Sequence, residues 1–385
     1  MILLRVSLFF IFLLILPDWY IYKTYIKPKH KKISGFWYWI PSIILLIALA
    51  VFLFLNPLSQ KAFSYYLIIT LCIAVPKTVF TICNLLLKGI KKLIRLPLFE
   101  GFISFLIAIA TFGYLLFGVT KGKEYFQIKE VSFFSPQLPE AFDGYRILQI
   151  SDLHTGSWKG NKQAIQKAIT LCNAQHADLA VFTGDLVNSR ADEVLEFMPI
   201  LSQLHAKDGV FSILGNHDYA TYTKWENEEA RLRNIDSLLV REKQMGWQML
   251  LNDNYILHRG NDSIALIGVE NSGNPPFPDK ADLPKALTGT DNMFKILLSH
   301  DPTHWRRNIL PETDIQLTLS GHTHDMQISL WGFSISQFIY PEHNGMYLEK
   351  GRGLYVNIGL GYVLFPMRLG AWPEITIITL HKQLN

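Results

Sequence analysis

The chain has 385 residues, which is too long for one average domain and sufficient for two. Its net charge of +4 is small, so the charge does not indicate a nucleic-acid partner. Its three cysteines are too few for a disulfide framework or a cysteine-based zinc site, and they are Cys72, Cys83 and Cys172.

Apolar segments dominate the first third of the chain, and each is close to the roughly 20 residues that cross a hydrocarbon core. They cover residues 2–22, 36–55, 63–87 and 96–119. Pro76-Lys77 interrupts the third segment, which is then either a kinked span or a span that ends there and continues as an interfacial helix. We therefore expect a bundle of about four transmembrane helices over residues 1–122 and a second domain over residues 123–385.

The basic residues of the loops predict the orientation of this bundle. The first and third loops are basic, whereas the second carries only Lys61. The basic residues are Lys23, Lys27, Lys29, Lys31 and Lys32 in the first loop, and Lys88, Lys91, Lys92 and Arg95 in the third. By the positive-inside rule, both termini of a four-span bundle then lie outside the cytoplasm. We expect a multi-pass protein of the inner cell membrane with an extracytoplasmic C-terminal domain, an orientation that loss of the third span would reverse.

The rest of the chain alternates between short apolar runs and helical patterns. Strands are predicted over residues 125–134, 145–150, 178–182, 209–214, 294–298, 315–319, 353–358 and 374–380. Three more strands are expected to form an antiparallel run, over residues 247–251, 255–258 and 264–269. Helices are predicted over residues 161–174, 191–205, 225–245 and 302–310, and a loop over residues 271–280. This order predicts an α/β domain of two packed sheets flanked by helices.

Five of these strands end in side chains that commonly bind metals. They are Asp152 with His154, Asp185, Asn216 with His217, His300, and His322 with His324. Sites in open α/β sheets lie outside the carboxyl ends of the strands, so five such ends on one sheet edge would gather these side chains. Glycines precede three of them, where a tight turn brings the backbone close to the site, at Gly184, Gly215 and Gly321.

Taken singly, each motif is more typical of a turn, a cap or a structural histidine, and only the set of five indicates a site. Carboxylate, amide and imidazole ligands without a thiolate suit Mn, Fe or Zn. Their number favours two divalent ions about 3.5–4 Å apart, an arrangement that supports phosphoryl transfer. In an extended segment, His322 and His324 would both face one point. His304 is interpreted as a packing residue.

The order Asp-x-His, Gly-Asp, Gly-Asn-His-Asp, His and Gly-His-x-His resembles the calcineurin-like metallophosphoesterase superfamily, over residues 125 to 385. Residues 145–154, with the sequence YRILQISDLH, resemble its membrane-anchored, bacterial-type branch. The resemblance implies a four-layer sandwich in which two sheets lie between helices. Members of this branch usually have two small residues, often glycines, after the last motif histidine, where this chain has Asp325-Met326. This departure bears on substrate preference and leaves the ligand positions intact.

The resemblance also implies roles for individual residues. The first metal would be held by Asp152, His154, Asp185 and His324, and the second by Asp185, Asn216, His300 and His322, with Asp185 as the bridge. A hydroxide between the two ions would attack the phosphorus in line. His217 would protonate the leaving group. Asp218 would orient the His217 ring, cap a helix, or do both.

These features together predict a membrane-anchored phosphoesterase that uses two divalent metal ions to hydrolyse a phosphodiester or pyrophosphate bond. Its expected partners are membrane lipid and a phosphate-ester substrate, which the anchor suggests is lipid-linked or part of the envelope. The family includes enzymes that cleave UDP-diacylglucosamine, which is one specific example. The alternative is a non-catalytic metal-binding scaffold or sensor on a membrane bundle.

The sequence predicts less about the segments around the site and about the role of the bundle. The loop 271–280 and the aromatic-rich segment 331–347 are expected to flank the site and to set specificity. Arg368 is interpreted either as a contact to a phosphate or as the ion-pair partner of Glu374. The bundle is interpreted as an anchor, alone or with access for lipid. Because Lys77 has no expected charged partner there, the sequence does not favour a transporter.

Overall fold

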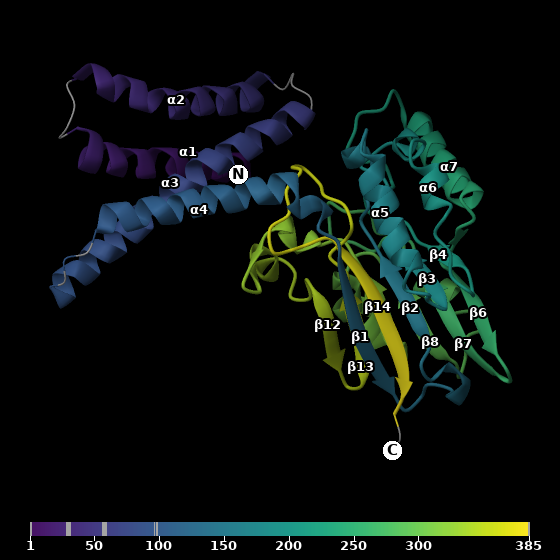
Figure 1. Ribbon diagram of the computed structural model, residues 1–385. Helices are drawn as coiled ribbons and strands as arrows, with labels where there is room; N and C mark the ends of the chain where they lie inside the picture. Colours follow the sequence, from purple (N-terminus) through teal and green to yellow (C-terminus); the bar gives the residue numbers. More distant parts are fainter. Residues whose placement is uncertain (1, 28–31, 56–59, 96, 98, 384–385) are drawn as a thin grey trace. The chain divides into compact units, whose positions relative to one another are not determined.

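The computed structural model describes residues 2–27, 32–55, 60–95, 97 and 99–383 (Figure 1). The chain forms two compact units. The first comprises Met1–Gly122 with Leu364–Met367, and the second comprises Lys123–Val363 with Arg368–Asn385.

The first unit consists of long apolar helices. Its described helices are α1 (Ile2–Ile21), which continues as a π-helical turn over Tyr22–Ile26, α2 (Lys32–Leu55), α3 (Gln60–Ile94) and α4 (Glu100–Thr120). In the described part of the chain, four helices are long and apolar enough to cross a membrane, as predicted. The alternative that the third span ends at Pro76 is wrong, because α3 continues through this proline as one helix.

The basic residues near the helix ends lie differently from the prediction. Lys88, Lys91 and Lys92 belong to the C-terminal part of α3 rather than to a loop, and Arg95 follows the helix. Lys29 and Lys31 of the first loop lie outside the described residues. The positive-inside rule also counts basic residues close to the ends of the spans. The orientation therefore remains a prediction from the same basic residues.

A buried ion pair corrects the expectation that Lys77 has no charged partner in the bundle. The Lys77 ammonium lies 2.7 Å from the carboxylate of Asp18, which is fully buried. This carboxylate also accepts hydrogen bonds from the hydroxyl of Tyr38, at 2.9 Å, and from that of Ser42. Sequence reasoning does not find Asp18, because a charge near the end of an apolar segment is ordinary. Polar contacts therefore join α1, α2 and α3 inside an apolar unit.

The second unit contains two six-stranded sheets and a small hairpin. The first sheet, in spatial order, is β1 (Gln127–Ser135), β14 (Glu374–Lys382), β2 (Arg146–Ile150), β3 (Leu179–Phe182), β4 (Val210–Ser212) and β5 (Gln248–Met249). The second is β12 (Gly345–Glu349), β13 (Arg352–Val356), β9 (Leu317–Ser320), β8 (Phe294–Leu298), β7 (Asp262–Gly268) and β6 (Asp253–Arg259). The hairpin is β10 (Ser329–Leu330) with β11 (Phe333–Ser334).

Parallel pairing brings the ends of the central strands together. Strands β2, β3, β4 and β5 are mutually parallel, as are β7, β8, β9 and β13. Strand β14 is antiparallel to β2, and β6 and β12 pair antiparallel at the edges of the second sheet. Both sheets are therefore mixed, and the carboxyl ends of their parallel strands are available for a site.

Three apolar cores give the second unit four layers. One core lies between the two sheets and includes Ile147, Val181 and Ile296. The other two lie between each sheet and its helices. These helices are α5 (Lys162–Asn173), α6 (Met198–Leu201), α7 (Glu228–Gln244), α8 (Leu283–Ala286) and the π-helical turn Trp305–Ile309, which continues into α9 (Leu310–Glu312). The predicted sandwich of two sheets between helices is confirmed.

Some predicted elements differ from the structure. The helix over residues 191–205 is interrupted, with a 3-10 turn at Ala191–Val194 before α6, because Pro199 cannot donate to a preceding turn. Strand β5 pairs parallel with β4, so the predicted antiparallel run contains only β6 and β7. Strand β12 is absent from the prediction, because its five residues do not alternate between apolar and polar and its pairing with β13 defines it.

Candidate metal centre

The predicted metal ligands follow the carboxyl ends of five strands. In the first sheet, β2, β3 and β4 lead into Asp152 with His154, Asp185, and Asn216 with His217. In the second sheet, β8 and β9 lead into His300, and into His322 with His324. The expectation of a single sheet edge is therefore wrong, because both sheets contribute. The structure nevertheless brings all of these side chains together.

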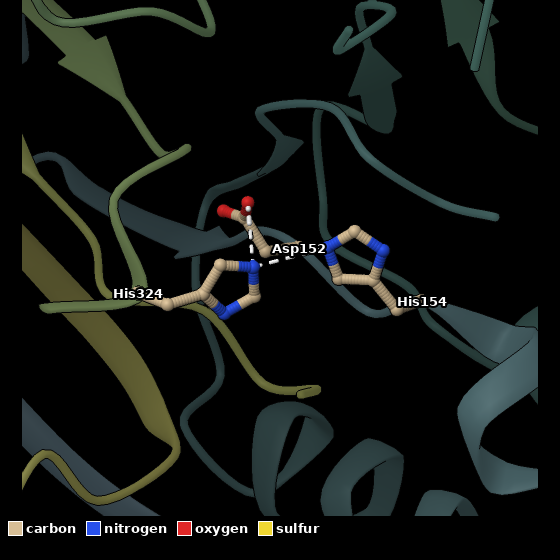
Figure 2. Close-up of side chains that lie close together, drawn as sticks. All are labelled: Asp152, His154 and His324. Carbon is tan, nitrogen blue, oxygen red and sulfur yellow. Dashed lines mark hydrogen bonds and ion pairs between the residues drawn. The ribbon is translucent and has the colours of Figure 1, made fainter. Parts of the chain in front are cut away.

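Asp152, His154 and His324 form the first cluster (Figure 2). The Nε2 atoms of His154 and His324 are 3.0 Å apart, and Asp152 Oδ1 is 3.3 Å from the same His324 nitrogen. All three side chains are buried. Two neutral imidazole nitrogens at this distance can share only one proton, whereas a cation between them would satisfy both. This donor set therefore fits a divalent metal.

Asn216, His300 and His322 form the second cluster, together with Asp185. Asn216 Oδ1 is 3.1 Å from His300 Nε2 and 2.7 Å from His322 Nδ1. Asp185 Oδ2 is 3.3 Å from His300 Nε2. The other nitrogen of His322, Nε2, is 3.0 Å from the hydroxyl of Tyr340. One amide oxygen, one carboxylate and two imidazoles thus converge, which is again a donor set that fits a divalent metal.

Asp185 lies between the two clusters. Its Oδ2 atom, which faces His300, is also 3.7 Å from His154 Nε2. Its Oδ1 atom accepts a hydrogen bond from the backbone N–H of His217 at 2.8 Å. One oxygen therefore faces both clusters, while the main chain fixes the other. A carboxylate that bridges two ions needs this placement.

Burial and neighbouring charges set the protonation states. Burial lowers the pKa of His154 to about 3 and that of His322 to about 4, and it holds the pKa of His324 well below its ordinary value. Burial would raise the pKa of Asp185, but His300 and other imidazoles outweigh it and keep this pKa well below its ordinary value. Burial would lower the pKa of His300, but Asp185 raises it to about 10. The site thus offers three neutral imidazoles around an ionised carboxylate, while His300 is held as a cation by Asp185 and would lose its proton on binding a metal.

His217 lies beside the clusters and is oriented by a backbone carbonyl. Its Nδ1 is 2.7 Å from the carbonyl oxygen of Asn188, which can only accept, so Nδ1 carries the proton. Its ring stacks on Tyr222, with centroids 4.2 Å apart, and stands edge-on to His154 at 4.8 Å. The imidazole is half-buried, so it can meet a substrate that enters the site.

Asp218 does not contact the His217 ring, and the prediction that it orients this ring is wrong. It does not cap a helix either, since α7 begins only at Glu228. Its carboxylate instead accepts hydrogen bonds, at 2.8–3.1 Å, from the backbone N–H groups of Asp185, Leu186, Val187 and Gly215. Asp218 therefore holds the loop that carries Asp185 and acts on the site through the backbone.

Close backbone approach explains the glycines that precede the ligands. A Cβ atom on Gly215 would lie 2.5 Å from the backbone nitrogen of Asp185, and one on Gly321 would overlap Asp152. The prediction of close approach is confirmed at both positions. The prediction that His322 and His324 share one face is wrong, because both have left-handed backbones, with φ of 78° and 50°, and they enter different clusters.

The left-handed backbone continues beyond the last motif histidine. Residues Asp325, Met326 and Gln327 have φ of 48°, 50° and 62°. Each non-glycine residue in this region costs roughly 1–2 kcal/mol, so small residues or glycines would fit these positions with less strain. Asp325 is buried, and its carbonyl oxygen accepts a hydrogen bond from the Ser334 hydroxyl at 2.8 Å. This bond ties the strained turn to strand β11.

Arg368 supports His324 from within the core. It is fully buried, which excludes a contact to a substrate phosphate, and Glu374 pairs with Lys129 instead. Both interpretations of Arg368 are therefore wrong. Its guanidinium donates to the carbonyl oxygens of Ile358 and Gly361 at 2.8 and 2.6 Å, and Nη2 is 2.9 Å from His324 Nδ1.

Other residues confirm or extend the prediction. His304 is a buried packing residue, as predicted, with Nδ1 2.9 Å from the Ser299 hydroxyl. Asn188 is absent from the predicted site, Tyr340 is predicted only as part of the flanking segment 331–347, and the contact of Arg368 to His324 is not predicted. No local pattern marks them, because each reaches the clusters only through a tertiary contact.

The fold and the two clusters define a class of protein, the metal-dependent phosphoester hydrolases. A family model described as "Calcineurin-like phosphoesterase" matches residues 145–326. A second, described as "Probable Calcineurin-like phosphoesterase, transmembrane domain", matches residues 4–123. The chain belongs to the calcineurin-like metallophosphoesterase family, and it is a multi-pass membrane protein.

The similar proteins include metallophosphoesterases, one of which is named as a transmembrane protein. The "Uncharacterized metallophosphoesterase YkuE" of Bacillus subtilis is 32% identical over 64% of this chain and 82% of that protein. A "Transmembrane protein with metallophosphoesterase domain" of Danio rerio is 29% identical over 69% of this chain, which spans 60% of that protein's length. The "UDP-2,3-diacylglucosamine pyrophosphatase LpxG" of Chlamydia trachomatis is 27% identical over 58% of this chain and 81% of that protein.

Substitution of Arg368 tests its role as a buried hydrogen-bond donor in the core. Arg368→Met removes the donor to several buried carbonyl groups, so we expect the free energy of unfolding to fall by about 3 kcal/mol or more. The thermal unfolding of the full chain in detergent measures this loss. Arg306→Met is the matched control, because Arg306 is half-exposed and its ion pairs with Glu342 and Glu349 should contribute at most about 1 kcal/mol. Equal losses in the two variants would contradict the assigned role.

Proposed function

We propose that the chain is a membrane-anchored dinuclear-metal phosphoesterase that hydrolyses a phosphodiester or pyrophosphate bond of a lipid-linked or envelope substrate. The observation that carries this proposal is the position of Asp185 Oδ2 between two clusters of metal-type side chains. Family membership supports the hydrolysis of a phosphate ester. The similarity to a protein named UDP-2,3-diacylglucosamine pyrophosphatase supports a lipid-linked pyrophosphate as one specific substrate.

Each cluster would hold one divalent ion. The first ion would be held by Asp152, His154, Asp185 and His324, and the second by Asp185, Asn216, His300 and His322. Hard and borderline donors without a thiolate suit Mn, Fe or Zn. When bound, such ions polarise the phosphoryl oxygens and make the attacking water more acidic.

The chain's own residues would position the substrate's leaving group. His217 keeps its Nδ1 proton on the Asn188 carbonyl, which leaves Nε2 to carry a second proton toward the leaving oxygen. The stacked ring of Tyr222 restricts rotation of the imidazole. Asp218 holds the backbone on both sides of Asp185, so the bridging carboxylate keeps its place when substrate binds.

Replacement of His217 tests the proton donor. His217→Ala should retain two ions per chain but lower kcat on bis-p-nitrophenyl phosphate with Mn²⁺ by about 10²–10⁴-fold. The exposed His205→Ala is the control and should keep wild-type turnover. Unchanged turnover in His217→Ala would remove the assignment of His217. A wild-type protein that binds two ions and leaves this diester intact would instead favour the non-catalytic scaffold.

Replacement of Asp185 tests the bridge. Asp185→Asn removes the charge that both clusters share, so the metal content should fall below two ions per chain. Elemental analysis of the purified protein after equilibration with Mn²⁺ measures this content. Asp192→Asn is the control, because Asp192 is exposed and pairs with Arg241 at the surface. Retention of two ions by Asp185→Asn would refute the bridging role.

A reporter at the C terminus tests the proposed orientation. With loops one and three in the cytoplasm, an alkaline phosphatase fused after residue 385 should be active, and a fused fluorescent protein that folds only in the cytoplasm should be dark. The opposite pair of results would place the catalytic unit in the cytoplasm and would overturn the orientation.

A further inference from the structure

A run of large apolar side chains is exposed beside the candidate metal centre. It lies in the hairpin β10–β11 and the 3-10 turn that follows, and it is called the 330–339 segment. Its exposed members are Leu330, Trp331, Phe333, Ile335, Phe338 and Ile339. Trp331 is completely exposed, and Phe338 and Ile335 are 75% and 65% exposed. The surfaces of soluble proteins rarely expose so many apolar side chains together unless they bind a partner or a membrane.

The geometry of the hairpin places Trp331 at its tip. Trp331 and Gly332 form a two-residue connection, with φ of 52° and 82°, between the paired residues Leu330 and Phe333. Such turns favour Asn-Gly, so a tryptophan here is strained as well as exposed. The rings of Phe333 and Phe338 are 6.0 Å apart and join the hairpin to the following turn. The segment is therefore one continuous apolar surface with an aromatic tip.

The 330–339 segment is attached to both metal clusters. Before it, Asp325 follows His324 of the first cluster and accepts a hydrogen bond from Ser334 within the segment. After it, the Tyr340 hydroxyl is 3.0 Å from Nε2 of His322, in the second cluster. The chain thus leaves the site at His324 and returns to it at Tyr340. A molecule that covers the segment would lie next to the reacting phosphate.

We propose that the 330–339 segment inserts into the surface of a lipid bilayer. The chain itself carries four helices that can span a membrane, so a bilayer is the apolar phase to which the second unit is tethered. No charged residue occurs between Asp325 and Glu342, which removes the usual obstacle to insertion. Tryptophan and phenylalanine are the residues that membrane interfaces favour.

Insertion at this place defines a substrate class, an inference that rests on the proposed phosphoesterase function. The phosphate of a membrane lipid lies at the level of the headgroups, where an inserted hairpin would hold the metal centre. The substrate is then a phosphoester whose apolar part stays in the bilayer during hydrolysis. Small water-soluble diesters would reach Asp185 without any contact to the segment.

Site-specific fluorescence in lipid nanodiscs tests the insertion. An NBD label is attached at Trp331→Cys or Phe338→Cys in the full chain, with the three native cysteines replaced by alanine. Lipids that carry a spin label at the headgroup or upper acyl chain should quench both labels by more than about twofold, since an interfacial segment is buried at that depth. The matched control is a label at Phe134→Cys, which is exposed at the end of β1 that lies opposite the carboxyl end of β2, and it should not be quenched.

Each outcome has a defined meaning. Quenching that does not exceed that of the Phe134 control overturns the insertion. A label that is shielded from water yet not quenched overturns it in favour of a protein contact. Hydrolysis of bis-p-nitrophenyl phosphate by the labelled proteins shows that the site is intact. If the wild-type protein does not hydrolyse this diester, the phosphoesterase function is refuted, whereas the insertion is still decided by the quenching alone.

A paired aspartate variant tests the substrate class. The lipid substrate is a phosphodiester of dioleoylglycerol and p-nitrophenol, supplied in nanodiscs. Trp331→Asp combined with Phe338→Asp should lower the turnover of this lipid about tenfold or more, because two charges oppose insertion. The same variant should hydrolyse bis-p-nitrophenyl phosphate like the wild type. Equal effects on both diesters, or no hydrolysis of the lipid diester by the wild type, would overturn the substrate class.

Discussion

The candidate metal centre depends on one carboxylate oxygen, Asp185 Oδ2, which faces an imidazole of each cluster. Several features of the second unit serve to hold it there. The His217 backbone fixes the other oxygen, and Asp218 fixes the backbone on either side. Gly215 must lack a side chain because Asp185 occupies that volume. The buried carboxylate remains ionised because its imidazole neighbours outweigh the effect of burial on its pKa.

The sequence predicts the parts of this site that lie in short local patterns. An apolar strand followed by a candidate ligand is such a pattern, and five of these patterns predict Asp185 and its partners from the sequence alone. Roles that depend on tertiary contacts could not be predicted. Asp218 next to His217 suggested a pair, but its carboxylate turns to backbone N–H groups, and Asn188 orients the imidazole instead. Arg368 likewise reaches His324 only because its chain segment folds back through the core.

Local signals likewise predict individual helices and strands of the fold, but not how the strands pair. Helix α5 follows from its apolar spacing and from Asn161, whose side chain accepts the Ala164 N–H as a cap. The assignment of β5 to one sheet rather than the other depends on which neighbour it pairs with, and no periodicity records that choice. Backbone strain is equally hidden. The left-handed turn at Asp325-Met326 becomes visible only in the structure, where it shows that glycine would fit these positions with less strain.

The Asp18–Lys77 pair has a consequence for how the protein enters a membrane. Neither charge is favourable in hydrocarbon alone, so α1 and α3 gain from meeting before either is released into lipid. The order of synthesis delays this meeting until α2 has been made, and Tyr38 and Ser42 of α2 supply hydroxyl donors to Asp18 in the meantime. Biogenesis of the anchor should therefore be cooperative across three helices, and a truncation that removes α3 would leave an unpaired carboxylate for cellular quality control to recognise.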